Sequence, residues 1–288
     1  MSADLERFYN NDPTLTQLCL SYMSYGADVL RRIIEHLTIN STLQTLHMHS
    51  VNLDVENIEY LAEVLARNTS LLNLNLGGNN LGPADARLIA TALNVNSTLT
   101  TLLLSSNNLG VEGVKYITDV FSKKPWLKQV DFSSNNLGME GAKCIADALQ
   151  HNIPDEIGDF GLTWLALSGN NIGPVGAEYI AEALRANTTL KYLFLHGNNL
   201  GLDGVGHIVG ALHINSTLTS INLSHNNYGT EILRYFRGFM EHNSSIVDIC
   251  FGREFYNVLV PFMERNQHNT TIRAQTLFSL LLPRLEFD

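Results

Sequence analysis

The stretch LLNLNLGGNNLG (residues 71–82) decides the fold, because the chain repeats it at a fixed spacing. Residues 99–110 (LTTLLLSSNNLG) and 190–201 (LKYLFLHGNNLG) carry the same pattern of leucine, asparagine and glycine. The frame L-x-x-L-x-L-x-x-N-x-L starts nine times at steps of 28 residues, with one step of 35. The starts are Leu15, Leu43, Leu71, Leu99, Leu127, Leu162, Leu190, Leu218 and Ile246. A constant period of this length indicates a solenoid, in which each repeat stacks on its neighbours.

The composition agrees with a repeated unit. Leucine and asparagine, with 45 and 30 copies, make up about a quarter of the 288 residues, because each repeat reserves positions for them. Hydrophobic residues make up 45% of the chain, which supports a large core and excludes a disordered protein. The 18 lysine and arginine residues against 28 aspartate and glutamate residues leave a net charge of −10, which argues against nucleic-acid binding.

The sequence suggests a cytoplasmic chain that does not enter a membrane. Residues 1–13 have neither the basic start nor the apolar run of a secretory signal. The longest apolar stretches, such as residues 276–283, are far too short for a membrane span. The three widely spaced cysteines, Cys19, Cys144 and Cys250, are typical of free thiols in a reducing compartment.

Each repeat is predicted to form a strand, a turn, a helix and a second turn. The L-x-L centre points its leucines into a core and the residue between them outward. The following asparagine is expected to bond to backbone groups of the turn, and the glycine after it to let the chain swing round. These positions are Asn79, Asn107, Asn135, Asn170, Asn198 and Asn226, and Gly82, Gly110, Gly138, Gly173, Gly201 and Gly229. Residues 176–187 (GAEYIAEALRAN) then show the apolar spacing of a helix. The predicted fold is α/β, a right-handed solenoid with a concave parallel β-sheet inside and helices outside.

We expect one domain spanning residues 1–288, with an N-terminal cap over residues 1–14 and a C-terminal cap over residues 272–288. About nine repeats fill residues 15–271, with a seven-residue insertion near residues 153–161. The asparagine position decays at the ends, where it holds Met23, Val51 and Glu254, as expected where one face must meet water. An alternative use for the apolar residues Leu277 to Leu282 is binding to a partner.

The repeat resembles a known family. The phrase N-x-[ST]-L-x-x-L-x-L-x-x-N-x-[LIY]-G, which covers about residues 15–270, resembles the leucine-rich repeats of the ribonuclease-inhibitor-like class. It is similar to the sensor regions of NOD-like receptors and to repeats of some bacterial effectors and protist proteins. The resemblance implies the fold but leaves the function open, because family members inhibit enzymes, sense ligands, activate a small GTPase or scaffold complexes.

Seven asparagines begin an N-x-[ST] sequence, the acceptor motif for N-glycosylation. They are Asn40, Asn68, Asn96, Asn187, Asn215, Asn243 and Asn269. Six of them occupy the same repeat position, at the turn from helix to strand, and Asn269 lies two residues before that position. We therefore attribute the motif to the period and not to glycosylation.

Three aromatic residues at outward strand positions are the main candidates for partner binding. Trp164, Tyr192 and Phe194 fall on adjacent strands, about 4.8 Å apart. Aromatic residues often anchor protein interfaces, and Leu103 and Asp131 are predicted to share this concave surface. The alternative interpretation is that the rings only shield one another.

The single break in the period is the second candidate. Between Asn152 and Leu162 the chain has seven extra residues, three of them acidic: Asp155, Glu156 and Asp159. Insertions in solenoids project from a rim and often bind partners, and this one leads into the strand of Trp164. Together with Asp131 it would select a partner with a basic surface. The alternative is a tolerated loop without a function.

Catalytic chemistry is only weakly indicated. Cys19, His47 and His49 are expected on one face of neighbouring strands, where they could form a Cys–His pair or bind zinc. No orienting carboxylate accompanies them, so we interpret them as scattered polar residues. His196 and His225 are expected near strand ends without partners. We predict that the protein is not an enzyme and holds no cofactor and no metal.

The sequence therefore predicts a monomeric, non-catalytic interaction module that binds a protein partner with a basic or mixed surface on its concave face. Nucleic acid and membrane are not expected partners. The resemblance to bacterial effectors adds a second possibility, a virulence protein delivered into the cytosol of a host cell. Two alternatives remain. One is a regulator that activates a small GTPase, although this sequence does not show the long acidic C-terminal tail of the family member with that activity. The other is a self-associating structural scaffold.

Overall fold

The chain folds into a single open sheet of nine parallel strands whose order follows the sequence. The computed structural model describes residues 3–121, 123–124, 126–152, 161–233, 235, 239, 243–251 and 256–269. Each strand has three residues: β1 (Gln17–Cys19), β2 (Thr45–His47), β3 (Asn73–Asn75), β4 (Thr101–Leu103), β5 (Gln129–Asp131), β6 (Trp164–Ala166), β7 (Tyr192–Phe194), β8 (Ser220–Asn222) and β9 (Asp248–Cys250). Equivalent repeat positions are paired in register, as Leu74 with Leu102 and, across the period break, Val130 with Leu165.

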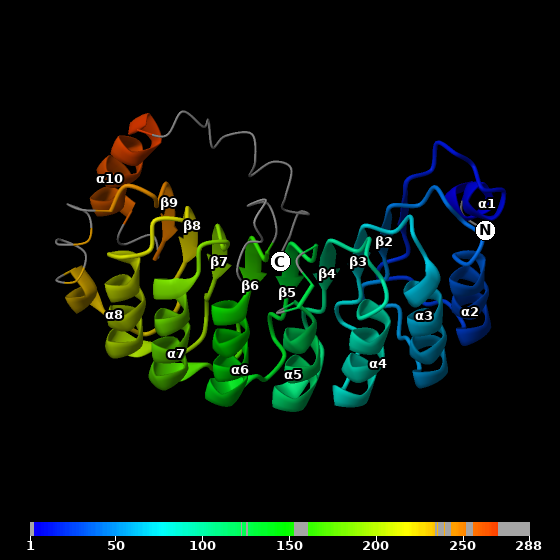
Figure 1. Cartoon of the computed structure of the whole chain (residues 1–288), viewed down its shortest axis with the longest axis horizontal. Coiled ribbons are helices and arrows are strands. Elements are labelled where there is room, and N and C mark those ends of the chain that lie inside the picture. The colour runs from blue at the N-terminus through cyan, green and yellow to red at the C-terminus, as the bar shows by residue number, and fades with distance from the viewer. Residues whose placement is uncertain are drawn as a thin grey trace.

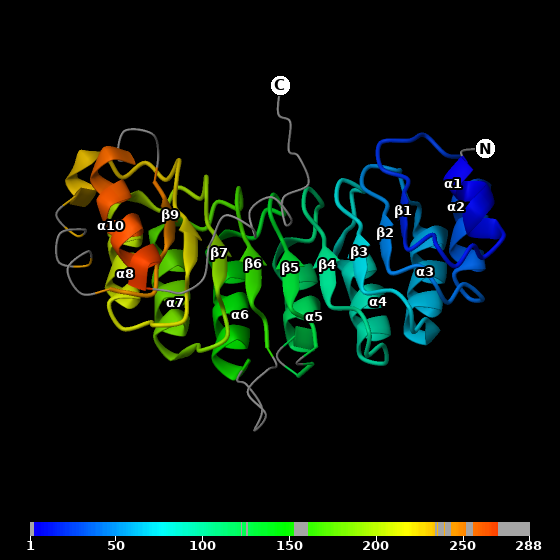
Figure 2. The same cartoon turned by 90° about the horizontal axis from the view of Figure 1, so that it is seen from above.

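Helices alternate with the strands along the chain. They are α1 (Ala3–Tyr9), α2 (Ala27–His36), α3 (Val55–Arg67), α4 (Pro83–Leu93), α5 (Gly110–Phe121), α6 (Gly138–His151), α7 (Gly173–Ala186), α8 (Gly201–Leu212) and α10 (Tyr256–Asn269), with a short 3-10 helix η1 (Thr230–Ile232). Helices α2 to α8 lie on the outer side of the sheet, and α1 and α10 lie at its two ends (Figure 1). Figure 2 shows the strands side by side from β1 to β9. The predicted α/β solenoid, with strands inside and helices outside, is confirmed.

The alternation of buried and outward residues follows the leucine pattern. In the repeat of β7, Leu193 and Leu195 are fully buried, whereas Tyr192 and Phe194 are half-buried. The helices pack closely because small residues face the preceding helix. A Cβ atom on Gly176 would lie 3.2 Å from the Cα of Met139, so glycine at this position lets α7 approach α6. Stacking of the repeats in this way buries one continuous core.

The predicted asparagine position forms a ladder along the rim where strands lead into helices. The side chain of Asn198 is fully buried. Its Nδ2 donates hydrogen bonds to the carbonyls of Leu167 and Leu195, at 2.8 and 3.0 Å. Its Oδ1 accepts from the backbone N–H of Asn170 at 2.8 Å. We call Asn79, Asn107, Asn135, Asn170, Asn198 and Asn226 the first ladder, because the same contacts recur along it. The ladder satisfies backbone groups that the short strands leave unpaired.

A second ladder, which the sequence did not predict, runs along the opposite rim, where helices lead into strands. In Asn96, Nδ2 donates to the carbonyl of Leu65 at 2.8 Å and Oδ1 accepts from the N–H of Leu99 at 2.9 Å. The second ladder consists of Asn40, Asn68, Asn96, Asn152, Asn187, Asn215 and Asn243. Six of these residues begin N-x-[ST] sequences, and their amides are engaged in the fold. The repeat period explains these sequences, as expected. The hydrogen bonds of the second ladder explain why each repeat has asparagine at this position.

The glycine prediction holds at five of its six positions. Gly110, Gly138, Gly173, Gly201 and Gly229 have φ angles between 57° and 69°, in the left-handed region that favours glycine. Gly82 differs, with φ of −102°. It is the N-cap of α4, because Pro83 starts the helix at the next residue. The N–H of Gly82 donates to Asp85 Oδ2 at 2.8 Å.

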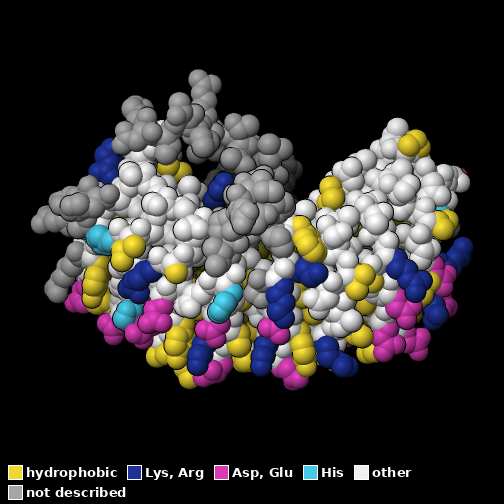
Figure 3. Space-filling view, viewed as in Figure 1, with side chains coloured by type: hydrophobic (Ala, Val, Ile, Leu, Met, Phe, Trp, Pro, Cys, Tyr) yellow, Lys and Arg dark blue, Asp and Glu magenta, His cyan; other side chains and the backbone are white. Residues whose placement is uncertain are grey.

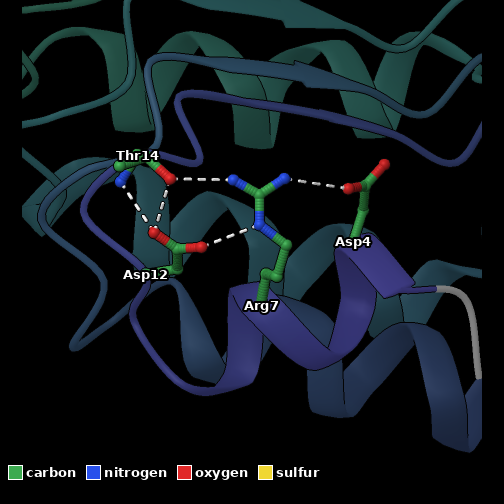
Figure 4. A network of polar contacts seen from close by, with 4 residues as sticks. All are labelled: Asp4, Arg7, Asp12 and Thr14. Carbon is green, nitrogen blue, oxygen red and sulfur yellow. Dashed lines mark hydrogen bonds and ion pairs between the residues drawn. The ribbon is translucent and has the colours of Figure 1, made fainter.

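A polar network holds the N-terminal end of the solenoid together (Figure 4). The guanidinium of Arg7 donates to Asp12 Oδ2 at 2.7 Å and to Thr14 Oγ1 at 2.9 Å, and it lies 3.3 Å from Asp4 Oδ1. The Thr14 hydroxyl, with help from Arg7, lowers the pKa of Asp12 to about 2. Asp12 stands 28 residues before Asn40, so this network begins where the second ladder would start.

At the other end, α10 contacts β9. Asn266 is fully buried, and its Nδ2 donates to the carbonyls of Ile246 and Asn243 at 2.7 and 3.3 Å. Residues of α10 therefore continue the bonding of the second ladder onto the last strand. Residues 270–288, with the apolar stretch Leu277 to Leu282, lie outside the described residues.

Candidate functional site

The structure brings the three predicted aromatic residues together on β6 and β7. Trp164 pairs in register with Tyr192, and Ala166 pairs with Phe194. The ring centroids of Trp164 and Phe194 are 5.2 Å apart, with the rings tilted by 46°. All three rings are half-buried. We call Trp164, Tyr192 and Phe194 the aromatic patch. The contact between Trp164 and Phe194 shields part of these two rings, and each of the three rings keeps exposed surface that a partner can cover.

Asp131 and Leu103 lie next to the aromatic patch on the concave sheet. They are paired in register on β5 and β4, and Asp131 also pairs with Ala166 of β6. The Asp131 Oδ1 atom accepts a hydrogen bond from the N–H of Ser133 at 2.8 Å. Burial raises the pKa of Asp131 although this hydrogen bond acts in the opposite direction. The carboxylate is therefore poorly solvated beside an apolar surface.

This raised pKa predicts a pH-dependent effect of Asp131→Asn. The folded protein binds the Asp131 proton more tightly than the unfolded chain does, so the ionised group lowers stability as pH rises through the raised pKa. We expect the variant to raise the thermal unfolding midpoint at pH 7 by about 1–3 °C. The difference should vanish at about pH 3, below the ordinary aspartate pKa of about 3.9. Scanning calorimetry at both pH values checks this expectation.

The control for that measurement is Asp147→Asn, at an exposed position of α6. A similar gain in both variants would show that reduced net charge, and not the desolvation of Asp131, causes the effect. An Asp131→Asn protein that is less stable at pH 7 would contradict the argument directly.

The acidic insertion joins the fold through the second ladder. The Oδ1 atom of Asn152 accepts from the N–H of Leu162 at 2.7 Å, and its Nδ2 donates to the carbonyl of Phe121 at 2.6 Å. In other repeats the same oxygen bonds the N–H three residues ahead, whereas here the partner is ten residues ahead. Asp155, Glu156 and Asp159 themselves lie outside the described residues. The ladder thus passes the insertion without interruption.

The cysteine and histidine candidates are close but do not form a recognisable metal site. Cys19 and His47 are register partners on β1 and β2. The ring of His49 lies 4.9 Å from that of Tyr22, centroid to centroid, and burial lowers the pKa values of His47 and His49. Within the described residues, no group of three or more histidine, cysteine or acidic side chains is placed to hold a metal ion.

The expectation that His196 and His225 have no partners was wrong. Their ring centroids are 5.2 Å apart, because the 28-residue stacking places consecutive turns next to each other and the two rings lean together. Both residues are exposed. Desolvation of the His196 ring by its surroundings lowers the pKa of His196, and the neighbouring His225 lowers it further.

Cys144 lines a hollow of about 190 Å³ between α5 and α6, on the helical side of the molecule. Other lining residues include Lys115, Asp147 and His151. Burial and the charge of Asp147 raise the pKa of the Cys144 thiol, against the opposing effect of Lys115. A thiol that stays protonated is a poor nucleophile, so the hollow has no evident covalent chemistry at this cysteine.

Comparison with known proteins identifies the repeat. The family model described as "Leucine Rich repeat" matches residues 67–90, 95–117, 123–146, 162–181 and 215–236. The chain is a leucine-rich-repeat protein. Its 28-residue units and its helix-backed sheet place it in the ribonuclease-inhibitor-like class. Leucine-rich repeats indicate a protein-interaction module.

The comparison with solved structures finds similarity to three proteins, among others. The leucine-rich repeat-containing protein LegL7 from Legionella pneumophila has a TM-score of 0.56 and 19% identity, covering 90% of this chain and 80% of its own. The actin-binding site 2 of leiomodin-1 has a TM-score of 0.46 and 22% identity, covering 51% of this chain and 86% of its own. The tropomodulin C-terminal domain from Caenorhabditis elegans has a TM-score of 0.45 and 15% identity, with coverages of 55% and 94%. None of the curated proteins matches the chain in sequence.

In the described part of this leucine-rich-repeat protein, no helix is both long enough and apolar enough to cross a bilayer. Charged side chains gather along the helical edge of the face drawn in Figure 3.

The sequence did not lead to a prediction for Trp126, which is the other tryptophan of the chain besides Trp164. The signal was available, because Lys124 replaces the expected asparagine two residues before it.

Proposed function

We propose that the protein binds a protein partner on its concave face, through the aromatic patch, and that it acts by occupancy without catalysis. The observation that supports this proposal is the cluster of three half-buried rings on β6 and β7, with Trp164 and Phe194 in contact. Tryptophan and tyrosine dominate interface hot spots because a large rigid ring buries much surface at a small entropic cost. Leu103 is a further apolar residue on the same sheet, two strands from β6 and separated from it by Asp131.

The charge of the surface favours a partner with a basic or mixed face. Asp131 lies one strand from Trp164 and is poorly solvated. A cationic group of a partner would replace the missing water around this carboxylate and would orient the complex. The acidic residues Asp155, Glu156 and Asp159 would add long-range attraction for the same partner, and the net charge of −10 supports a protein over a nucleic acid.

The test is a comparison of partners captured by matched variants. The native chain and a Trp164→Ala/Phe194→Ala variant of equal thermal stability are used to capture proteins from cytosol, and the affinity of each captured protein is then measured. We expect the double variant to lose the main partner, with an affinity at least about 30-fold weaker, as for removal of a hot spot of about 2 kcal/mol. An identical partner list with unchanged affinities would sink the proposal.

Two further variants make the comparison specific. Gln17→Ala/Thr45→Ala changes the same concave sheet at β1 and β2, away from the aromatic patch, and should retain the partner. An Asp155→Asn/Glu156→Gln/Asp159→Asn variant should slow association, with a larger effect at low salt. If the β1 and β2 variant loses the partner as well, the binding surface lies elsewhere on the sheet.

The alternative functions have distinct outcomes. Capture of a small GTPase whose nucleotide hydrolysis the chain accelerates would favour the regulator, and a dimer or larger species in light scattering would favour the scaffold. The proposal of a bacterial effector in a host cytosol rests on the sequence resemblance. The similarity to the Legionella pneumophila protein, at 19% identity, concerns the fold alone.

A further inference from the structure

Lysine is distributed unevenly along the chain. Five of the six lysines lie between residues 115 and 143, namely Lys115, Lys123, Lys124, Lys128 and Lys143. The protein as a whole has a net charge of −10. The repeat pattern does not require lysine at these positions, so the clustering of lysine in this part of the sequence needs its own explanation.

The second ladder is replaced by other residues at the start of the fifth repeat. In the preceding repeat, Asn96 and Thr98 use their side chains to bond the carbonyls of Leu65 and Leu71. The equivalent residues 28 positions later are Lys124 and Trp126. At this turn the N–H of Leu127 is bonded by the backbone carbonyl of Lys124, at 3.4 Å. Lys124 and Trp126 are therefore not side chains that the repeat requires.

The two residues form a contact of their own at the rim. The Lys124 ammonium lies 4.8 Å from the centroid of the Trp126 ring, within range of a cation–π interaction. Lys124 and Trp126 are half-buried, and Lys123 is exposed. We call Lys123, Lys124 and Trp126 the rim patch. Figure 3 shows lysine and arginine side chains near the middle of the face it draws.

The ammonium groups of the rim patch keep their capacity for an acidic ligand. The ion pairs found among the described residues involve Arg7 and Arg31, and neither Lys123 nor Lys124 takes part in one. The half-buried ring of Trp126 adds an apolar surface beside the Lys124 ammonium. This combination of two neighbouring lysines and an aromatic ring fits a short peptide in which carboxylates flank an apolar residue.

The rim patch lies shortly before the strand that pairs with the strand of Trp164. Residue Lys128, four positions after Lys124, leads into β5, and its carbonyl accepts from the N–H groups of Thr163 and Trp164 at 2.9 and 3.1 Å. A partner on the concave face can therefore reach the rim with an adjoining segment. Because surface charges act over about 8 Å at physiological salt, such a segment senses the local lysines. A long polyanion would meet the acidic remainder of the chain.

We propose that the rim patch is a second binding site, which takes an acidic segment of a partner protein. The site goes beyond the concave-face function and does not depend on it. The lysines of the rim patch contact carboxylates of the segment, and the Trp126 indole contacts an apolar side chain of the same segment.

The chain supplies its own reporter for the test. It has two tryptophans, so a Trp164→Phe variant leaves Trp126 as the single indole. Titration of this variant with hexaglutamate should give a saturable change in Trp126 emission, with a dissociation constant on the order of 10–100 µM. The affinity should fall at least fivefold when NaCl is raised from about 50 to about 500 mM. Iodide should quench the emission more strongly than caesium, because the Lys124 ammonium lies over the ring.

Charge variants on the same background locate the site. Lys123→Gln/Lys124→Gln should weaken hexaglutamate binding at least fivefold, with an unchanged thermal unfolding midpoint. Lys143→Gln is the matched control, because Lys143 lies 5.7 Å from the Tyr179 ring in a similar contact on the helical side, and it should change the affinity less than twofold. Equal weakening by the two variants, or no saturable change with hexaglutamate, would overturn the proposal. Binding of a thymidylate hexanucleotide or of hexalysine as tight as that of hexaglutamate would overturn it as well.

Discussion

An Asn198→Ala variant is expected to lose about 2–6 kcal/mol of its free energy of unfolding. The side chain is fully buried and bonds the carbonyls of Leu167 and Leu195 and the N–H of Asn170. Alanine leaves the N–H of Asn170 without this partner, at a cost of about 1–3 kcal/mol, and removes one hydrogen bond from each carbonyl, at a cost of about 0.5–1.5 kcal/mol each. The two carbonyls keep a second hydrogen bond, from Asn170 Nδ2 and Asn226 Nδ2. Urea titration followed by circular dichroism measures the change.

The ladder also joins repeats, so the variant should unfold less cooperatively. Asn170 N–H bonds Asn198 Oδ1, and Asn198 N–H bonds Asn226 Oδ1 at 2.7 Å. Alanine keeps the N–H that bonds Asn226, so the loss falls on the interface with the preceding repeat, and such interfaces carry much of the stability of a solenoid. We expect a broader transition with a smaller dependence on denaturant concentration.

The matched control is the next residue, Asn199. It is exposed, has φ of 53° and uses its side chain only at the surface, where Nδ2 donates to Asn171 Oδ1. Asn199→Gly keeps the left-handed backbone accessible and should cost less than about 1 kcal/mol. Comparable losses in the two variants would show that the buried amide is not the source of the stability.

A Gly161→Ala variant is expected to lose about 2–4 kcal/mol of its free energy of unfolding. Gly161 has φ of 130°, which an alanine adopts only with strain. A Cβ atom there would lie 2.6 Å from Thr189 Cγ2 and 3.0 Å from Asn152 Oδ1. The clash falls on the side chain that bonds Leu162 across the insertion, so the variant should loosen the second ladder at that point. Chemical denaturation gives the difference.

The control for this substitution has the opposite expected sign. Gly210 lies inside α8, and the nearest heavy atom to an added Cβ is Arg185 Nη2, at 3.9 Å. Gly210→Ala should therefore stabilise the protein by about 0.4–1 kcal/mol, because alanine restricts the unfolded chain and fits the helix. A neutral or stabilising Gly161→Ala would refute the described geometry of this junction.

The sequence predicted the strands, their register and the first ladder because all three follow from the period. Once Leu74 and Leu102 are known to be equivalent, their pairing and the burial of both side chains follow from stacking alone. The candidate residues Trp164 and Phe194 were placed on neighbouring strands by the same argument. Their contact was not predictable, because it depends on side-chain torsions that the period leaves free.

Other features were missed for identifiable reasons. The N-x-[ST] asparagines were treated as a by-product of the period, although a polar residue kept at a buried turn position is expected to bond the backbone there. The contact between His196 and His225 depends on ring orientation. The sequence signal for Trp126 is the change from asparagine to Lys124 two residues before it, and this signal does not reveal the contact between the two side chains.

The hydrogen bond between Asn152 and Leu162 has a practical consequence. It brings the two ends of the seven-residue insertion to the spacing that an ordinary repeat has between residues three apart. The fold therefore fixes the insertion at its two junctions, Asn152 and Leu162. This position is a ready point for grafting a foreign peptide, an epitope or a fluorescent label onto the solenoid.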